Sequence, residues 1–348
     1  MALRLNELSY YALFMNICIL GAGAWGTSMA QHLVRSGQNV TLVPRRMEHA
    51  MAMATTHENE DYLPGVTLDP NIQIASELRP ALMEAELILF ACPSQGLRDW
   101  CERLKSVLDS SLRLKALVTL CKGLEQSTLR YPVDLVRELI PGYHYGVLSG
   151  PNYAREVAEG KPTATVLAMD APEDELAAYQ EALHGERLRV YRSGDVAGVE
   201  LGGCLKNIYA IGAGFCDGLG LGDNARAAFL TRALHEMVRL GVAFGGLKET
   251  FYGLSGIGDL TATCSGEWSR NRTFGESIAR GRSVTGLMDK RKTVVEGYWA
   301  TACFYVKCKE KELDAPILCE VYKVLHEGKP PAQVVEALMS RPTKPEHV

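Results

Sequence analysis

The 348-residue sequence predicts an α/β domain with a mainly parallel sheet, followed by an all-α domain. Short apolar runs alternate with helical segments up to about residue 193, which is typical of strand–helix–strand units. After that point strand-like runs largely vanish, and apolar residues recur with the period of a helix. The length is sufficient for two domains with substantial cores.

The overall composition is that of an ordinary globular protein. Hydrophobic residues make up 47% and charged residues 22%, with a formal net charge of -4. Such a charge creates no global field that attracts nucleic acid or an acidic membrane, so a local cluster must hold any anionic ligand. No apolar run is long and clean enough to span a bilayer. We therefore expect neither a nucleic-acid partner nor membrane insertion.

The ten cysteines form no C-x-x-C pair, and none lies near a histidine at zinc-ligand spacing. We expect no metal site. Reduced thiols in a cytoplasmic protein are the simplest interpretation, although an unpatterned set leaves a disulfide open.

The N-terminus carries a pattern that resembles a secretory signal. Arg4 precedes an apolar stretch, Tyr10–Met15, and small residues follow near Gly21. Cleavage there would remove the first predicted strand, so we reject a signal peptide. We interpret residues 1–14 as an N-terminal extension and residues 15–193 as a dinucleotide-binding domain.

The segment Asn16–Thr27 predicts the dinucleotide site. A buried strand, Ile17–Leu20, leads into Gly21, Gly23 and Gly26, which have G-x-G-x-x-G spacing. The first glycine permits a tight turn, the second lets the backbone approach a pyrophosphate, and the third lets the next helix pack closely. A glycine-rich turn can also serve packing alone, but the flanking strand and helix favour a nucleotide.

The end of the second predicted strand, Val40–Val43, predicts which cofactor is bound. Arg45 and Arg46 follow Pro44, and the first carboxylate is Glu48. A carboxylate there would bind the ribose hydroxyls of NAD, whereas arginines suit the 2′-phosphate of NADP. A solvated basic turn is the alternative. We expect NADP(H) to be favoured and NAD(H) to be possible.

Later strands of the first half end in polar or glycine-rich turns, where ligands of parallel sheets bind. Lys122 follows the strand Leu117–Leu120, and Gly150 and Asn152 follow Tyr145–Ser149. Lys122 is thus a candidate for the rim of the site, although most lysines are simply on the surface.

The second half, residues 194–340, is predicted to be a helical substrate and catalytic domain, and residues 341–348 a frayed tail. One amphipathic helix has Phe229, Leu230, Ala233, Leu234, Met237, Val238, Gly241 and Val242 on its apolar face. Its polar face is predicted to carry Arg226, Arg232, Glu236 and Arg239.

Lys206 is the candidate catalytic residue. It lies beside Asn207 within a run of small and apolar residues. Burial lowers the pKa of an ammonium, which suits a group that exchanges a proton near neutrality. The alternative is a lysine at a helix end that reaches water.

Two further clusters carry polar groups. Asp259 follows three spaced glycines, and Ser269, Arg270 and Asn271 offer a hydroxyl, a guanidinium and an amide that can hold a phosphate. Taken alone, this segment is better interpreted as a capped loop with a surface arginine, but beside a cofactor fold and Lys206 the binding interpretation gains weight. A third segment, Val294–Gly297, places a carboxylate at Glu296.

The ordered set of motifs from Asn16 to Ala337 resembles bacterial NAD(P)-dependent glycerol-3-phosphate dehydrogenase. The matching segments are Gly21–Thr27, Lys122–Glu125, Ser149–Pro151, Leu201–Gly203 with Lys206–Asn207, Asp223–Arg226, Gly256–Asp259, Ser269–Arg272 and Val294–Tyr298. The resemblance implies a Rossmann-type domain, a helical domain like that of 6-phosphogluconate dehydrogenase, and a homodimer. The implied reaction interconverts dihydroxyacetone phosphate and sn-glycerol 3-phosphate for phospholipid synthesis.

The resemblance also implies a role for each matching residue. Lys206 matches the catalytic proton donor and acceptor. The substrate-binding positions are Lys122, Gly150, Asn152, Asp259, Ser269, Arg270 and Asn271. The cofactor-binding positions are Gly21, Gly23, Ala24, Trp25, Gly26, Arg45, Arg46, Lys122, Ala154, Arg270, Val294 and Glu296. Asn152 stands where some members have a hydroxyl residue, and Pro44 replaces a more usual small or polar residue.

Two other functions stay open at this point. A ketopantoate- or β-hydroxyacid-type reductase would share the glycine turn and a lysine but would act on a carboxylate substrate. A non-enzymatic dinucleotide sensor would bind the cofactor without turnover and would have little use for Lys206 and Arg270.

Overall fold

A computed structural model describes residues 14–289, 295–343 and 345–346. The N-terminal part is an α/β unit around an eight-stranded sheet of order β10-β9-β8-β7-β6-β1-β2-β5. The strands are β1 (Asn16–Leu20), β2 (Asn39–Val43), β5 (Gln73–Ile74), β6 (Leu87–Phe90), β7 (Ala116–Thr119), β8 (His144–Ser149), β9 (Thr163–Met169) and β10 (Leu188–Ser193). A small separate hairpin pairs β3 (Glu58–Asn59) with β4 (Leu63–Thr67).

The sheet is mainly parallel, as the sequence predicts. The exception is the β8–β9 pair, which is antiparallel, so that β9 and β10 run against the other strands. The connection between β8 and β9 contains a single short helix, α6 (Ala154–Ala158), and returns the chain beside β8 in the opposite direction. Apolar content alone did not predict this reversal, because a buried strand reads the same in either direction.

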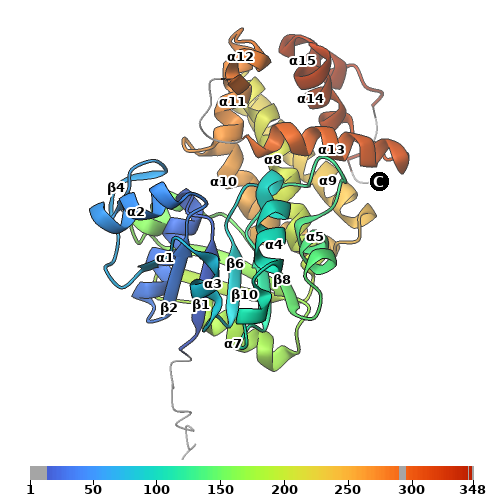
Figure 1. Cartoon of the computed structure of the whole chain (residues 1–348). Coiled ribbons are helices and arrows are strands. Elements are labelled where there is room, and N and C mark those ends of the chain that lie inside the picture. Colours follow the sequence, from blue (N-terminus) through green and yellow to red (C-terminus); the bar gives the residue numbers. More distant parts are fainter. Residues whose placement is uncertain (1–13, 290–294, 344, 347–348) are drawn as a thin grey trace, which may run out of the picture.

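Helices cover both faces of the sheet (Figure 1). They are α1 (Ala24–Arg35), α2 (Met47–Thr56), α3 (Leu78–Leu82), α4 (Leu97–Lys105), α5 (Pro132–Leu139) and α7 (Glu173–Leu183), with short 3-10 turns η1 (Ser94–Gly96) and η2 (Leu108–Ser110). Successive side chains of β1 point to opposite faces. Ile17 and Ile19 belong to the core that includes residues of α1 and α7, and Cys18 and Leu20 to the core that includes residues of α4 and α5.

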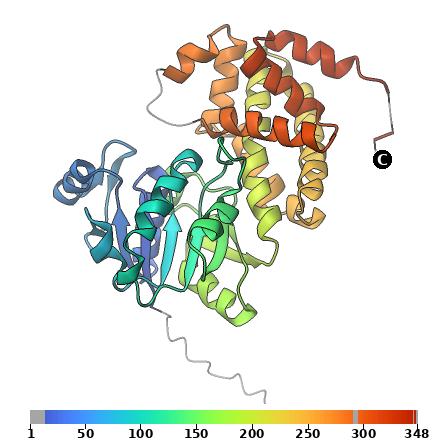
Figure 2. The same ribbon diagram turned by 45° about the vertical axis from the view of Figure 1, so that its right-hand side comes forward.

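The C-terminal part is helical, and its described residues contain no strand after Ser193. Its elements are α8 (Val196–Gly218), α9 (Gly222–Ala243), η3 (Lys248–Tyr252), η4 (Leu254–Gly258), α10 (Asp259–Ser265), α11 (Arg270–Ala279), α12 (Val284–Asp289), α13 (Glu296–Glu310), α14 (Pro316–Glu327) and α15 (Pro331–Met339). Figure 2 shows this part lying beyond the end of the sheet toward which the cyan arrow, β6, points. That end is the carboxyl edge, where parallel sheets bind ligands.

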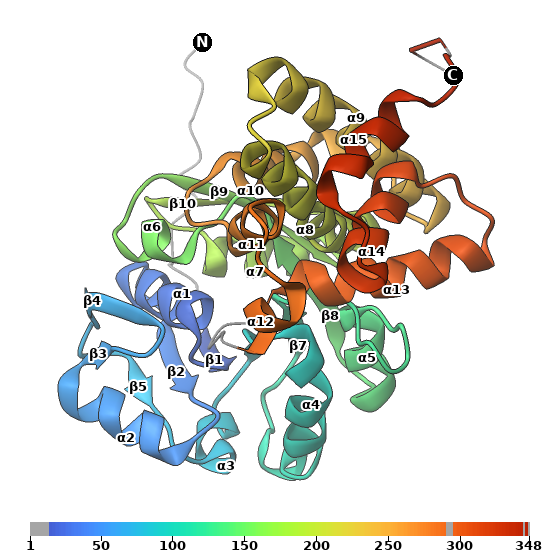
Figure 3. The same cartoon turned by 90° about the horizontal axis from the view of Figure 1, so that it is seen from above.

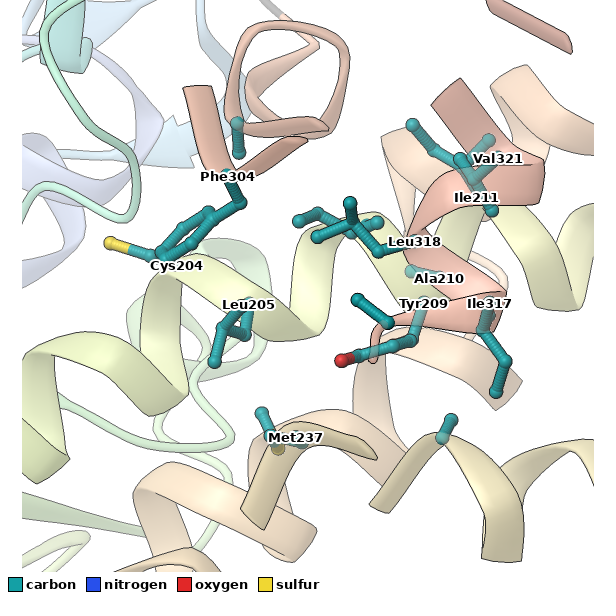
Figure 4. Close-up of a cluster of buried hydrophobic side chains, with 14 of the residues drawn as sticks. Cys204, Leu205, Tyr209, Ala210, Ile211, Met237, Phe304, Ile317, Leu318 and Val321 are labelled. Atoms are coloured by element: carbon teal, nitrogen blue, oxygen red, sulfur yellow. The ribbon is translucent and has the colours of Figure 1, made fainter. Parts of the chain in front are cut away.

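Helix α8 is the central element of the helical part. It is buried continuously from Gly198 to Phe215 and packs against α9, α10, α11, α13 and α14. Figure 4 shows Leu205, Tyr209 and Ile211 of α8 among apolar side chains of the surrounding helices. Close packing depends on glycine, because a Cβ on Gly214 would lie 2.1 Å from the carbonyl oxygen of Arg272.

Glu236 corrects the predicted polar face of α9. Its side chain is buried, and its carboxylate accepts hydrogen bonds from the backbone N–H groups of Ile317 and Leu318, at 2.8 and 2.9 Å. These groups lie in the first turn of α14, which begins with Pro316 and has no side-chain cap of its own. A helix start needs acceptors for its free N–H groups. A carboxylate from another helix supplies them here, which periodicity alone does not reveal.

Two of the expected chain divisions lie at least partly outside the described residues. Of the expected extension, residues 1–14, only Phe14 is described, and the predicted tail is described in part. Among the described helices, none is both long and apolar enough to cross a membrane. The structure describes all ten cysteines, and every one of them is a free thiol.

Candidate active site

The glycine turn between β1 and α1 has the geometry that its spacing predicts. Gly21 has a φ of +110°, and a Cβ there would lie 2.6 Å from the carbonyl oxygen of Ala91. A Cβ on Gly26 would lie 2.0 Å from the carbonyl oxygen of Gly21. Around Gly23, by contrast, a Cβ would meet nothing within 4 Å. Two glycines are therefore required by packing, and the third leaves the backbone open to a ligand.

The N-terminus of α1 fits a dinucleotide pyrophosphate. Gly23 precedes the helix and provides no side-chain cap, so the first backbone N–H groups face the open side of the turn. Asn59 stabilises the turn from behind, since its Nδ2 donates to the Ala22 carbonyl at 2.9 Å and to Thr27 Oγ1 at 2.8 Å. Ala24 begins α1 and is half-buried. The indole Nε1 of Trp25 is buried without a hydrogen-bond partner among the described residues.

The other predicted cofactor positions lie around this turn. Arg45 and Arg46 are exposed beyond the end of β2 and form ion pairs with Asp99 at 3.8 Å and with Asp61 at 3.1 Å. Ala154 begins α6, which packs against α1; Figure 3 shows the two helices side by side. Val294 lies outside the described residues.

Lys206 is buried within α8, and its ammonium faces the start of α10. Its Nζ donates to Asp259 Oδ1 and to Thr263 Oγ1, both at 2.7 Å. Asp259 and Thr263 are four residues apart on α10, so their side chains lie on the same face of that helix. The Thr263 hydroxyl donates in turn to the Asp259 carbonyl at 2.6 Å.

Lys122 joins the same carboxylate from the sheet side. Its Nζ lies 2.6 Å from Asp259 Oδ2 and also donates to the Gly150 carbonyl at 2.9 Å and to Asn152 Oδ1 at 3.0 Å. The ends of β7 and β8 and the start of α10 thus meet at one point. Two ammoniums share one carboxylate, so this group carries a net positive charge when all three are ionised.

The pKa values of Lys206 and Asp259 are both lowered, for different reasons. Burial lowers the pKa of Lys206 to about 8, while Asp259 acts to raise it and Lys122 to lower it. Burial opposes ionisation of Asp259, but the two lysines outweigh burial and lower the pKa of this carboxyl. Lys206 is therefore an ammonium that can release and regain a proton near neutral pH.

A chain of amide hydrogen bonds connects the predicted phosphate-binding residues to this group. Asn271 Nδ2 donates to Asn207 Oδ1 at 2.8 Å, and Asn207 Nδ2 donates to the Lys122 carbonyl at 2.9 Å. Ser269 caps α11, since its Oγ accepts from the Arg272 N–H at 3.2 Å. Arg270 is exposed, although the surrounding protein atoms lower the pKa of its guanidinium and Glu296 acts to raise it. An accessible guanidinium in such surroundings is suited to an anion.

Glu296 lies at the first position of α13 and contacts the sheet. Its carboxylate accepts hydrogen bonds from the Ser94 N–H at 3.1 Å and from the Ser94 hydroxyl at 2.5 Å. Ser94 follows β6, so this contact joins the carboxyl edge of the sheet to the helical part.

Three residues of this site were not predicted to act in it: Ser94, Asn207 and Thr263. The spacing of Asp259 and Thr263 on one helix is a signal that could have identified the threonine. The contacts of Ser94 and Asn207 depend on distant segments and leave no local signal. Among the described residues, no group of three or more His, Cys, Asp or Glu is arranged to hold a metal ion.

The comparisons with known proteins cover nearly the whole chain. Residues 16–175 match the family model for the N-terminus of NAD-dependent glycerol-3-phosphate dehydrogenase, and residues 195–336 match the model for its C-terminus. Glycerol-3-phosphate dehydrogenase [NAD(P)+] of Thiobacillus denitrificans is 44% identical over 335 residues, which cover 95% of this chain and 100% of that protein. The protein of the same name from Nitrosococcus oceani is 41% identical over 94% of this chain and 95% of its own length.

A solved structure gives the same result. The crystal structure of glycerol-3-phosphate dehydrogenase from Coxiella burnetii superposes with a TM-score of 0.88 at 36% identity, covering 94% of this chain and 99% of that chain. The two family models together span both the glycine turn and the lysine group. The chain belongs to the NAD-dependent glycerol-3-phosphate dehydrogenase family.

Proposed function

We propose that this chain catalyses the reversible, NAD(P)H-dependent reduction of dihydroxyacetone phosphate to sn-glycerol 3-phosphate, a precursor for glycerophospholipid synthesis. The observation that carries the proposal is the buried ammonium of Lys206 paired with Asp259. Family membership supports the oxidoreductase activity, and the relatives' names supply the substrate.

The cofactor fits the open side of the glycine turn. The open backbone at Gly23 and the first N–H groups of α1 would hold the pyrophosphate, in a turn whose close packing depends on Gly21 and Gly26. Ala24, Trp25 and Ala154 would lie beside the cofactor. When bound, the reduced nicotinamide supplies a hydride. Glu296, Arg270 and Lys122 would bind the cofactor where the sheet meets the helical part, and the role implied for Val294 stays a prediction.

The Lys206 ammonium provides the proton. Its Nζ would hydrogen-bond to the carbonyl oxygen at C2 of dihydroxyacetone phosphate, stabilise the negative charge that develops there and donate the proton. Asp259 holds Nζ in place and keeps it charged, because this carboxylate raises the lysine pKa against the effect of burial. In the reverse reaction neutral Lys206 would accept the proton.

The phosphate of the substrate would bind to Arg270 and Ser269. The Ser269 oxygen already accepts a hydrogen bond from Arg272, and its O–H remains able to donate to a phosphate oxygen. Asn271 would hold this end of the site mainly through Asn207, and Gly150 and Asn152 would complete it through Lys122. A fixed phosphate sets the distance between C2 and Lys206.

We propose a preference for NADP(H). Arg45 and Arg46 support it, because both guanidiniums are exposed and pair with half-exposed carboxylates that a phosphate dianion can replace. Replacing both arginines with alanine should raise the KM for NADPH about tenfold or more and leave the KM for NADH nearly unchanged. An equal rise for both cofactors would contradict the assignment.

Two further features are proposals as well. We place the domain boundary between Ser193, where β10 ends, and Val196, where α8 begins. We also propose a homodimer in the cytoplasm, by analogy with the family; light scattering on the purified chain at micromolar concentration tests the dimer.

A single steady-state assay tests the function. The purified chain is given NADPH or NADH with dihydroxyacetone phosphate, and in parallel with 2-ketopantoate. We expect oxidation of the cofactor with the phosphate ester and a kcat/KM at least about a hundredfold lower with the keto acid, because the site is built around a phosphate. Turnover with the keto acid alone, or cofactor binding without turnover, would contradict the proposal.

A further inference from the structure

We propose that Ser94 is a positioning residue, which holds the Glu296 carboxylate and with it the start of α13 against the carboxyl edge of the sheet. This inference rests on the proposed function, since Glu296 is one of the proposed cofactor contacts. Ser94 is not one of those cofactor contacts. It lies after β6 in the sheet part of the chain and would act on the cofactor through Glu296.

Ser94 contacts both oxygens of the carboxylate. Its backbone N–H donates to Glu296 Oε1 and its hydroxyl donates to Oε2. The two residues are 202 positions apart in the chain, and the Ser94 side chain is buried. Hydrogen bonds to an ionised group are stronger than neutral ones, and a bidentate pair also fixes the orientation of the carboxylate.

The Ser94 hydroxyl is itself oriented by its neighbour. Gln95 Nε2 donates to Ser94 Oγ at 3.3 Å and to the Leu124 carbonyl at 2.7 Å, while Gln95 Oε1 accepts from the Gln126 N–H at 3.0 Å. Because the Ser94 oxygen accepts from this amide, its O–H is directed toward Glu296. The turn after β6 is thereby tied to the loop that follows Lys122.

Gly123 leaves the space in which this contact forms. A Cβ on Gly123 would lie 2.7 Å from Glu296 Oε2 and 2.8 Å from Ser94 Oγ. Both distances are too short for a carbon beside an oxygen, so any side chain there would push the carboxylate away. Gly123 directly follows Lys122, which places the contact next to the lysine group.

Hydrogen bonds on the helical side close a ring. The Gly297 N–H donates to Asn271 Oδ1 at 3.0 Å, and Asn271 is linked through Asn207 to the Lys122 carbonyl. Starting at Ser94, the ring thus runs through α13, α11 and α8 and returns to the sheet. It holds the helix that carries Lys206 at a fixed position relative to the sheet edge.

The test is the variant Ser94→Ala, which removes the hydroxyl donor and leaves the backbone donor. We expect the dissociation constant and the KM for NADPH to rise about tenfold, as for loss of one hydrogen bond to a charged group, while kcat changes less than about twofold. Ser106→Ala is the matched control, since Ser106 is exposed and its hydroxyl donates within its own turn, to the Arg103 carbonyl.

A double-mutant cycle distinguishes positioning from a general structural effect. In a Glu296→Ala background, Ser94→Ala should have no further effect on the dissociation constant of NADPH, because the group on which Ser94 acts is absent. An equal effect in both backgrounds, or an unchanged dissociation constant in the single variant, overturns the proposal.

Gly123→Ala gives an independent check. It should weaken NADPH binding in the same direction as Ser94→Ala, whereas Gly96→Ala in the same region should not, since a Cβ on Gly96 meets nothing within 4 Å. Unchanged NADPH binding in Gly123→Ala overturns the proposal. Fluorescence titration with NADPH needs no turnover, so a failure of the proposed reaction and a failure of this inference give different results.

Discussion

The carboxylate of the lysine group and the carboxylates that cap two helices are both buried, but their surroundings affect ionisation in opposite ways. Asp259 lies between the ammoniums of Lys122 and Lys206, which lower its pKa despite burial. Glu200 and Glu236 accept hydrogen bonds from backbone N–H groups at the starts of α5 and α14. Burial raises the pKa of Glu200 to about 8 and that of Glu236 to about 7.

The difference shows that the partner, more than the depth of burial, decides whether a buried carboxyl stays ionised. Backbone dipoles offset part of the desolvation of Glu200, while two full positive charges outweigh it at Asp259. The first arrangement caps a helix. The second holds the ammonium of Lys206, the proton donor of the proposed reaction.

The largest expected effect comes from removing the ammonium of Lys206, which pairs with Asp259. Lys206→Ala should reduce kcat for dihydroxyacetone phosphate reduction by about a thousandfold, since general acid catalysis contributes about 10²–10⁴. Lys206→Arg keeps the charge but holds its proton too tightly, so it should be nearly as inactive. NADPH binding should change less than about threefold, as loss of a group outside the nucleotide turn predicts.

Steady-state kinetics with NADPH titration measures both quantities. Lys105→Ala, at an exposed lysine on α4, serves as the control and should match the wild type. A Lys206→Ala variant that retains near-normal turnover would remove this lysine from the mechanism.

A smaller effect is expected when the carboxylate of the same region loses its charge. Asp259→Asn leaves the buried Lys206 ammonium and the half-buried Lys122 ammonium without their counterion, so the pKa of Lys206 should fall and kcat should drop by about a hundredfold at pH 7.5. The loss should be partly recovered at lower pH, where Lys206 is protonated again. A loss of the same size at every pH would show that Asp259 acts only through structure.

The smallest expected effect is on stability and concerns Glu200, the carboxyl group that caps α5. The pKa of Glu200 is higher in the folded chain than its usual value of 4.5, so its contribution to stability is present at low pH and is lost as pH rises toward about 8. Between pH 6 and 9 the wild type should therefore lose about 2 kcal/mol that Glu200→Gln does not lose. Urea unfolding of both proteins at the two pH values measures this difference; equal losses would contradict the assigned pKa.

The sequence predicted the parts of this molecule that depend on local chemistry. The spacing of Gly21, Gly23 and Gly26 predicts their turn, and the apolar runs predict the strands. Both predictions depend only on residues that are close together in the chain. The antiparallel turn-back at β9 and the burial of Glu236 were not predicted. Both are set by partners far away in sequence, which no periodicity encodes.

The candidate site shows the same difference between residues that local sequence predicts and residues whose partners are distant in the chain. Lys206 and Asp259 were recognised separately from their small and apolar surroundings, and the structure brings them to 2.7 Å. The sequence does contain a signal for Thr263, because it follows Asp259 by four residues on one helix. No local pattern indicates Ser94, because its contact is with a glutamate 202 positions away in the chain.

The pH dependence of kcat/KM for dihydroxyacetone phosphate, at saturating NADPH, tests the central claim most directly. If Lys206 donates the proton from a pKa near 8, kcat/KM should fall above about pH 8, and the fall should move to lower pH in Asp259→Asn. A profile that stays flat to pH 10, or a fall at the same pH in both proteins, would contradict the account.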